Sequence, residues 1–271
     1  NTLNLAAGAN SLVDIFNVQH INGTSSDDVL TVTDGVFGPN NNSIIDLGAG
    51  DNTLNFSSGG LSLTVLNIQH INGNALDDFV QLNNDVSGIA IDLGGGNDTL
   101  ILASGTNSVA VSNVESISSN DFSGAPSDDT LTLLNDVTGV SVNLAQGNNT
   151  LNLAAGVNSL DSLFNMAQLN GSASDDTLTV TQQSFGTVFD MGAGNDTINF
   201  QSTAGGVTVV NTETVNGSAG NDFITIGTGA TATTITGGAG ADMITVGSSA
   251  VNFNFNAVGD SQTGNGDTIV N

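Results

Sequence analysis

The stretch Gly237-Gly238-Ala239-Gly240-Ala241-Asp242-Met243-Ile244-Thr245 places closely spaced glycines and one aspartate before an alternating apolar and polar run. Looser copies of this nine-residue turn lie upstream, at 217–225, 191–199 and 93–101. Glycine permits the positive φ angles and tight turning that such a segment needs. The stretch therefore predicts a recurring Gly-rich turn that leads into a short β-strand.

The turn recurs in two interleaved series along the chain. The first series comprises Gly50–Leu54, Gly96–Leu100, Gly147–Leu151, Gly194–Ile198 and Gly240–Ile244. The second comprises Asp27–Leu30, Asp77–Val80, Asp128–Leu131, Asp175–Leu178 and Asn221–Ile224. The period within a series is about 46 to 51 residues, and the steps between the series alternate near 20 and near 26. One turn of a parallel β-solenoid takes roughly 20 to 26 residues, the length of one step, so we expect each motif to mark one rung.

Short strands with strict alternation follow the turns. In Thr177–Val180 and Thr197–Phe200 the apolar side chains should point inward and the Thr and Asn side chains outward. Second strands are expected around Asp46, Asp92, Asn143 and Asp190. Third strands are expected around Asn17, Asn67, Asn113, Asn165 and Asn211, whose amides we expect to stack as a ladder.

These patterns predict an all-β fold, because no segment has helical periodicity over the length that a helix needs. We predict a parallel β-solenoid of roughly eleven rungs. It should form a single repetitive domain over residues 1–271, and we interpret the chain as part of a longer protein because its first residues resemble the second half of a repeat.

The charge restricts the possible partners. The chain has 26 acidic residues and no Lys or Arg, which gives a formal charge of −26. Nucleic acid is excluded as a partner, since phosphate binding depends on basic side chains, and anionic membrane surfaces are disfavoured. Membrane insertion is not expected either, because no apolar run approaches the roughly 18 to 20 residues that span a bilayer.

The motif itself points to calcium. Gly-rich turns leave backbone carbonyls beside a hard aspartate oxygen, and Ca²⁺ takes six to eight such oxygens, so an ion should bridge adjacent rungs. Asp beside Gly is often only a turn residue, but the ordered series favours metal. We predict several Ca²⁺ ions, held by Gly238, Gly240, Asp242, Gly220, Asp222, Gly194, Asp196, Gly96, Asp98, Asp51, Asp27, Asp28, Asp77, Asp78, Asp128, Asp129, Asp175, Asp176 and Asp267.

The repeat resembles the RTX (repeats-in-toxin) calcium-binding β-roll family. Residues 237–245 match the family nonapeptide at every defined position, and residues 217–225 lack one glycine. The copies at 191–199 and 93–101 replace the first glycine with an apolar residue, and 259–269 is similar to the run that often closes such arrays. Residues 190–271 are therefore the best-matching part. Upstream, Asp-Asp pairs replace the Gly-x-Asp core, so we expect ions mainly along one edge, and Asn148-Asn149 should be metal-free.

The resemblance implies a structural protein that a Gram-negative bacterium secretes unfolded through a type I system and that folds on Ca²⁺ outside the cell. Its place would be extracellular or at the cell surface, in a surface layer (S-layer), an adhesin or a matrix fibre. We also expect the chain to associate with itself, end to end or in a lattice.

The sequence predicts no enzymatic activity. His20 and His70 occupy equivalent repeat positions but lack a nucleophile arrangement, and no basic residue is present for lyase chemistry. One alternative is a non-catalytic RTX module of a secreted enzyme or toxin, which a Lys- and Arg-containing domain upstream would favour. The outward Thr-x-Asn and Thr-x-Thr pairs leave an ice-binding adhesin as a further alternative.

Overall fold

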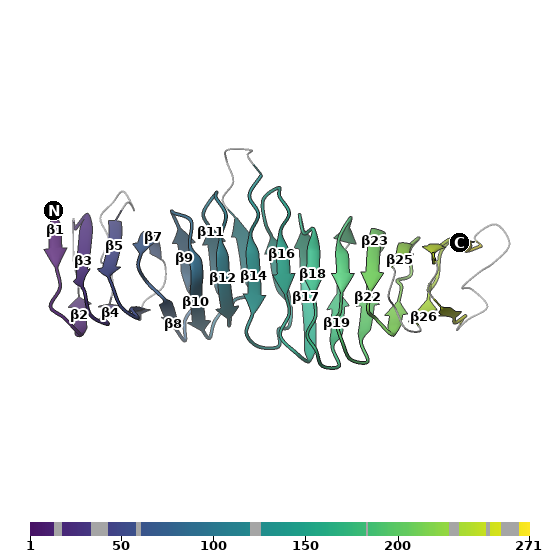
Figure 1. Cartoon of the computed structure of the whole chain (residues 1–271), viewed down its shortest axis with the longest axis horizontal. Coiled ribbons are helices and arrows are strands. Elements are labelled where there is room, and N and C mark those ends of the chain that lie inside the picture. Colours follow the sequence, from purple (N-terminus) through teal and green to yellow (C-terminus); the bar gives the residue numbers. More distant parts are fainter. Residues whose placement is uncertain are drawn as a thin grey trace. The chain divides into compact units, whose positions relative to one another are not determined.

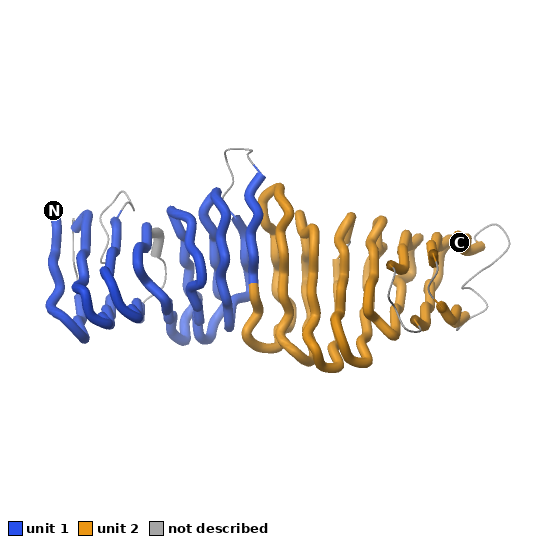
Figure 2. Tube along the Cα trace, viewed as in Figure 1, with its two compact units in different colours: residues 1–131 blue, residues 132–271 orange. Residues whose placement is uncertain are grey.

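The computed structural model describes residues 1–13, 18–33, 43–57, 61–119, 126–182, 184–227, 233–247, 250–255 and 266–271. Every helix or strand assigned in these residues is a β-strand, and the strands pair in parallel (Figure 1). The chain divides into two compact units, residues 1–131 and 132–271 (Figure 2). The predicted all-β parallel β-solenoid is confirmed, while the single-domain interpretation stays a prediction.

Unit 1 has two parallel sheets, and consecutive strands alternate between them. Sheet 1a contains β1 (Thr2–Asn4), β3 (His20–Thr24), β5 (Ser43–Gly48), β7 (Leu61–Leu66), β9 (Phe79–Leu82), β11 (Thr99–Leu102) and β13 (Ser116–Ser119). Sheet 1b contains β2 (Ala9–Val13), β4 (Val29–Thr33), β6 (Thr53–Phe56), β8 (His70–Asn74), β10 (Ser87–Gly94) and β12 (Ser108–Ser112). Strand β14 (Thr130–Leu133) contains the boundary between the units.

Unit 2 repeats this arrangement. Sheet 2a contains β15 (Val140–Asn143), β17 (Val157–Phe164), β19 (Thr177–Val180), β22 (Thr197–Phe200), β24 (Thr214–Asn216), β26 (Thr233–Thr236) and β28 (Val251–Phe253). Sheet 2b contains β16 (Thr150–Asn152), β18 (Gln168–Asn170), β21 (Val188–Asp190), β23 (Ala204–Val210), β25 (Phe223–Ile226), β27 (Met243–Thr245) and β29 (Thr268–Val270), with β20 (Ser184–Phe185) paired to β23. Because each strand pairs with the strand one coil away, both units are solenoids.

The core of each unit is a set of stacked apolar columns. In sheet 2a the column is Leu178, Ile198, Val215 and Ile235, all in register and all buried. In sheet 1b it is Leu30, Leu54, Ile71 and Ile91. The strands predicted at Thr177–Val180 and Thr197–Phe200 are confirmed with their inward and outward faces. Thr and Asn form the outer columns of these strands.

The motif turns lie on two edges of each unit, and the expectation of ions mainly along one edge stays a prediction. In unit 1, Asn52 precedes β6 of sheet 1b, whereas Asp78 precedes β9 of sheet 1a. In unit 2, Asp196 precedes β22 of sheet 2a, whereas Asp222 precedes β25 of sheet 2b. The 20 residues from Asp78 to Asp98 make one coil on one edge, whereas the 26 residues from Asn52 to Asp78 or from Asp196 to Asp222 pass one coil and cross to the other edge.

The expected ladder of stacked Asn amides in third strands is wrong. Asn67, Asn113, Asn165 and Asn211 all follow the ends of strands with positive φ, between 48° and 57°. Their side chains bond across one coil to a different position, as in the pair Asn67 Nδ2 to Asp46 Oδ1 at 2.7 Å. Asparagine tolerates this left-handed conformation better than most residues, which explains its recurrence here. Asn17 lies outside the described residues.

Two neighbouring glycines give a test of the turn geometry. Gly94 has a φ of +90°, and a Cβ added there would collide with the carbonyl group of Asn74 on the paired strand. Gly95 has open space, with the nearest atom of Ala75 at 3.9 Å from an added Cβ. We expect Gly94→Ala to lower the free energy of unfolding by at least ~2 kcal/mol, because left-handed backbone alone costs a non-glycine residue about 1–2 kcal/mol. The matched Gly95→Ala should change it by less than ~1 kcal/mol in urea unfolding, and equal effects of the two would contradict the turn geometry.

Candidate metal centres in the turns

A buried Asp or Asn closes most of the described motif turns by bonding to the coil before it. Its Oδ1 accepts the backbone N–H of the residue one coil earlier. These bonds are Gly8 N to Asp28 at 2.8 Å, Asp28 N to Asn52 at 2.8 Å, Asp78 N to Asp98 at 2.7 Å, Asn107 N to Asp129 at 2.9 Å, Gly156 N to Asp176 at 2.8 Å, Asp176 N to Asp196 at 2.8 Å, Ala204 N to Asp222 at 2.6 Å, Asp222 N to Asp242 at 2.9 Å and Asp242 N to Asp267 at 3.0 Å. We call this set the inner ladder, and it satisfies backbone N–H groups that no strand pairs.

Four aspartates of the motif turns also accept a hydrogen bond with their second carboxylate oxygen. Oδ2 of Asp28, Asp78, Asp176 and Asp222 accepts the N–H of the residue four positions earlier, at 2.6–2.8 Å. Burial alone would raise the pKa of Asp28, but bonds from Thr24 and Gly8 outweigh it and lower the pKa. In these turns, which we call closed turns, the carboxylate is held by protein donors.

In a second kind of turn, backbone carbonyl groups face the second terminal atom of the side chain, where the closed turns have an N–H group. Asn52 Nδ2 donates to the carbonyl oxygens of Gly48 at 3.1 Å and Asn67 at 2.9 Å. Asn149 Nδ2 makes the equivalent bonds to Ala145 at 2.6 Å and Asn165 at 2.8 Å. We call these open turns. An amide fits them completely, because its nitrogen supplies the donor that two carbonyls require.

Asp98 and Asp196 occupy turns of the open kind. Gly48, Gly94 and Gly192 have φ of +80°, +90° and +94°, and each donates its N–H to an aspartate two positions earlier. The left-handed residues that follow, Asn67, Asn113 and Asn211, also match in φ and in their bonds to those same aspartates. The backbone therefore offers Asp98 and Asp196 the carbonyls that Asn52 bonds.

The second carboxylate oxygen of these two residues is left without a donor. Asp98 is 1% exposed and Asp196 is 0% exposed, and Oδ2 of each has no hydrogen-bond partner among the described residues. A buried carboxylate oxygen that faces carbonyls is costly unless a proton or a cation lies between them. The donor set of hard oxygens fits Ca²⁺.

A glutamate completes both of these turns. Glu115 Oε2 accepts the N–H of Asp98 at 2.7 Å, and Glu213 Oε2 accepts that of Asp196 at 2.8 Å. The matching bond at Asn52 comes from an amide, Gln69 Oε1, at 2.8 Å. Glu115 and Glu213 lie outside the nine-residue turns, so the motif alone gives them no role. A sequence signal for their role does exist, because the two positions change together. Asn52 is accompanied by the amide Gln69, whereas Asp98 and Asp196 are accompanied by a glutamate.

Burial raises the pKa of several inner-ladder carboxyls. For Asp98 and Asp196 burial is the main cause, and the charges of the paired glutamate and of the preceding Asp-Asp pair raise the pKa further. Burial likewise raises the pKa of Asp129 and Asp222 against opposing hydrogen bonds. The shared cause at all four positions is the loss of water around the charged carboxylate, which hydrogen bonds from the protein only partly offset.

The remaining predicted ligands lie further out. Asp27, Asp77 and Asp175 are exposed and accept backbone N–H groups of the next coil at 2.8–2.9 Å. Asp51 is exposed and lies 3.2 Å from His70 Nε2. Asp128 is exposed, Asp129 and Asp242 are buried and Asp267 is half-buried. Gly96, Gly194, Gly238 and Gly240 have positive φ, and Gly220 lies in the turn before Asp222.

No group of three or more His, Cys, Asp or Glu side chains that could hold a metal occurs in the described part of the chain. An ion in these turns would therefore need backbone oxygens besides carboxylates. His20 and His70 lie in different sheets, on β3 and β8, so the structure does not bring them together. Residues 256–265 lie outside the described part, and so does most of the run at 259–269.

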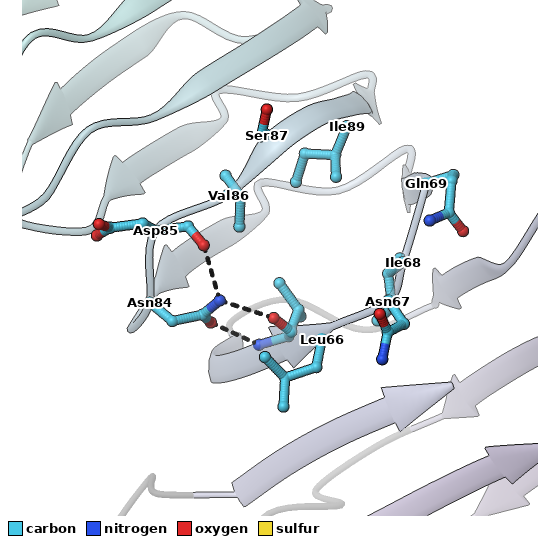
Figure 3. Close-up of a pocket in the computed structure, with 10 residues that line it drawn as sticks. Leu66, Asn67, Ile68, Gln69, Asn84, Asp85, Val86, Ser87 and Ile89 are labelled. Atoms are coloured by element: carbon cyan, nitrogen blue, oxygen red, sulfur yellow. Dashed lines mark hydrogen bonds between the residues drawn. The ribbon is translucent and has the colours of Figure 1, made fainter. Parts of the chain in front are cut away.

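A recess in unit 1 of about 200 Å³ lies beside Asn84 (Figure 3). Asn84 bonds both backbone groups of Val65, accepting its N–H at 2.9 Å and donating to its carbonyl at 2.8 Å (Figure 3). The Asn84 amide thus replaces the backbone hydrogen bonds that a neighbouring strand would make to Val65. Asp85 is the one charged residue that lines the recess, so it offers no cluster for chemistry.

No family model, curated protein or solved structure matches this chain. Among the described residues, no helix is long and apolar enough to cross a membrane.

The raised pKa values give a test in calcium-free protein. A group whose pKa is higher in the folded state stabilises the fold as pH falls, because the folded state then binds more protons. We expect thermal stability to rise from neutral pH towards the ordinary aspartate pKa of 3.8, and Asp28 opposes this rise only as the pH falls from about 3.8 towards its own lowered pKa. Thermal melts from pH 7 to pH 5 in metal-free buffer at high ionic strength, which screens repulsion between carboxylates, check this, and Asp98→Asn should reduce the rise. A steady loss of stability over this range would refute it.

Proposed function

We propose that this protein is a structural, calcium-stabilised β-solenoid of a bacterial cell surface, without enzymatic activity. The observation that carries this proposal is the inner ladder, which places an aspartate carboxyl in coil after coil of a chain without Lys or Arg. The coarser part, a solenoid built of structural repeats, is the fold itself. Calcium binding, secretion and a surface location are the proposed part.

The electrostatics support a cation. Neighbouring coils lie about 4.8 Å apart, and two carboxylates at that distance repel by roughly 3 kcal/mol at an effective dielectric constant near 20. Such terms accumulate along a ladder and approach the stability of an ordinary domain. Hydrogen bonds offset them on both carboxylate oxygens in the closed turns, but Oδ2 of Asp98 and of Asp196 has no donor among the described residues.

The same balance supplies a mechanism for folding after export. At low calcium the carboxyls repel and the unfolded chain is favoured, whereas external Ca²⁺ binds only the folded coils and stabilises them by linkage. The RTX-like repeats support type I secretion from a Gram-negative bacterium as the route. The alternative of a non-catalytic module of a secreted enzyme or toxin uses the same calcium chemistry, and self-association end to end or in a lattice stays a prediction.

Calcium-dependent folding is the direct test. In excess chelator at low ionic strength, we expect the β-sheet signal in circular dichroism to be lost, and Ca²⁺ titration should restore it. Mg²⁺ should restore it poorly, because it demands tighter octahedral coordination and dehydrates reluctantly. Identical thermal unfolding with Ca²⁺ and with chelator would exclude calcium as the stabilising partner.

One surface favours a second candidate function, ice binding. On sheet 2a, four successive strands carry outward pairs in register. These are Thr177/Thr179, Thr197/Asn199, Thr214/Asn216 and Thr234/Thr236. Parallel strands repeat every 4.7–4.9 Å, and alternate residues repeat about 6.6–6.8 Å along a strand. A regular array of hydroxyls and methyls can order water as a lattice does.

Ice binding has a simple test. If this surface binds ice, the calcium-loaded protein should show thermal hysteresis, and Thr214→Tyr at the centre of the array should abolish it. Thr150→Tyr on sheet 2b is the matched control and should leave it intact. Absence of hysteresis in the folded protein would remove this candidate and leave the structural role untouched.

A further inference from the structure

Four turns of this chain provide an internal comparison of amides with acids. At the inner-ladder position they carry Asn52, Asp98, Asn149 and Asp196. At the position that bonds the ladder N–H they carry Gln69, Glu115, Ala167 and Glu213. Both positions are neutral in the first and third turns and acidic in the second and fourth. The backbone that surrounds the first, second and fourth pairs is the same.

The neutral turns are complete without a ligand. Asn52 fills its turn by donating to two carbonyls while its N–H bonds Gln69. In the acidic turns the atom in place of that donor is an oxygen, buried and without a partner among the described residues. A second carboxylate, from Glu115 or Glu213, lies against the same residue. The acidic turn therefore has two carboxylates where the neutral turn has a saturated amide, on a backbone whose φ angles and hydrogen bonds match those around Asn52.

We propose that Asp98 with Glu115, and Asp196 with Glu213, are two dedicated calcium sites, and that the closed-turn aspartates are metal-free. The carbonyl oxygens of Gly94 and Asn113 contribute to the first site, and those of Gly192 and Asn211 to the second. Two carboxylates balance the charge of one Ca²⁺, and water completes the six to eight ligands that the ion takes. The exposed glycines of each turn leave a path from solvent.

This inference deepens the proposed function and rests on it for the identity of the ion. It departs from the sequence prediction in two ways. It adds Glu115 and Glu213, which no Gly-rich turn contains, and it removes Asp28, Asp78, Asp176 and Asp222. Those four carboxylates already accept N–H groups on both oxygens, from the backbone in every case except Oδ1 of Asp78, which accepts the side-chain amide of Asn74. An ion there would have to displace these bonds.

The test is to exchange the acidic pair for the neutral pair and the reverse. Asp98→Asn with Glu115→Gln should remove one bound Ca²⁺ per chain while the fold persists, because the amide restores the bonds seen at Asn52. Asp196→Asn with Glu213→Gln should remove another, and all four together should remove two. In the opposite direction, Asn52→Asp with Gln69→Glu should add one. Calcium stoichiometry of the full chain is measured by equilibrium dialysis and isothermal titration calorimetry.

The control variant removes two charges elsewhere. Asp85→Asn with Asp136→Asn alters exposed carboxylates and should leave the calcium stoichiometry unchanged. Unchanged stoichiometry in both amide double variants would overturn the proposal, as would calcium-free wild type in which Asp98 and Asp196 simply carry protons. Circular dichroism separates this result from the proposed function. If folding needs calcium but the amide variants keep every ion, these two sites are wrong and the proposed function stands. If the chain binds two ions but folds without them, the sites stand and the proposed role of calcium in folding is wrong.

Discussion

The bond from a turn N–H to a buried side-chain oxygen one coil away is the constraint on which the rest of this solenoid depends. Strand pairing satisfies the sheets, but the corners between them leave backbone groups inside the molecule, where an unpaired donor is costly. Asp and Asn are short enough to reach back across one coil spacing. Either residue can accept the N–H with Oδ1, as Asp28 does for Gly8 and Asn52 does for Asp28. The hydrogen bond to Oδ1 therefore does not determine whether the residue is Asp or Asn.

The group that faces the second terminal atom, Oδ2 of Asp or Nδ2 of Asn, determines which of the two residues fits. Where the residue four positions earlier turns its N–H inward, as Thr24 does, an aspartate is satisfied and an amide nitrogen would meet a donor. Where a left-handed glycine such as Gly48 turns its carbonyl inward, asparagine is satisfied. Asp98 and Asp196 break this local rule. Departures from otherwise consistent local chemistry are expected at functional positions, and here they coincide with a nearby glutamate.

Much of the fold could be predicted from the sequence, because alternation at Thr177–Val180 or Thr197–Phe200 fixes which face is buried. The edge on which each motif turn lies could not be predicted, since steps of 20 and 26 residues look alike in a sequence. Only the structure shows that the longer step leads to the opposite edge. Asn67 resembled a strand residue because it lies between two apolar residues, yet its φ is left-handed. The pairing of Asp98 with Glu115 depends on a contact between coils, and a motif confined to one turn does not contain it.

An ion at either acidic turn would act beyond its own ligands. The charges of Asp77 and Asp78, one coil away, contribute to the raised pKa of Asp98, and Asp175 and Asp176 do the same for Asp196. Neutralising the acidic pair therefore relieves repulsion in the neighbouring coil as well. In a repeat protein, stability is a sum of repeat terms and nearest-neighbour terms, so a local gain spreads only through adjacent coils. Unit 1 contains Asp98 and unit 2 contains Asp196, so each compact unit carries its own acidic turn from which ordering can spread.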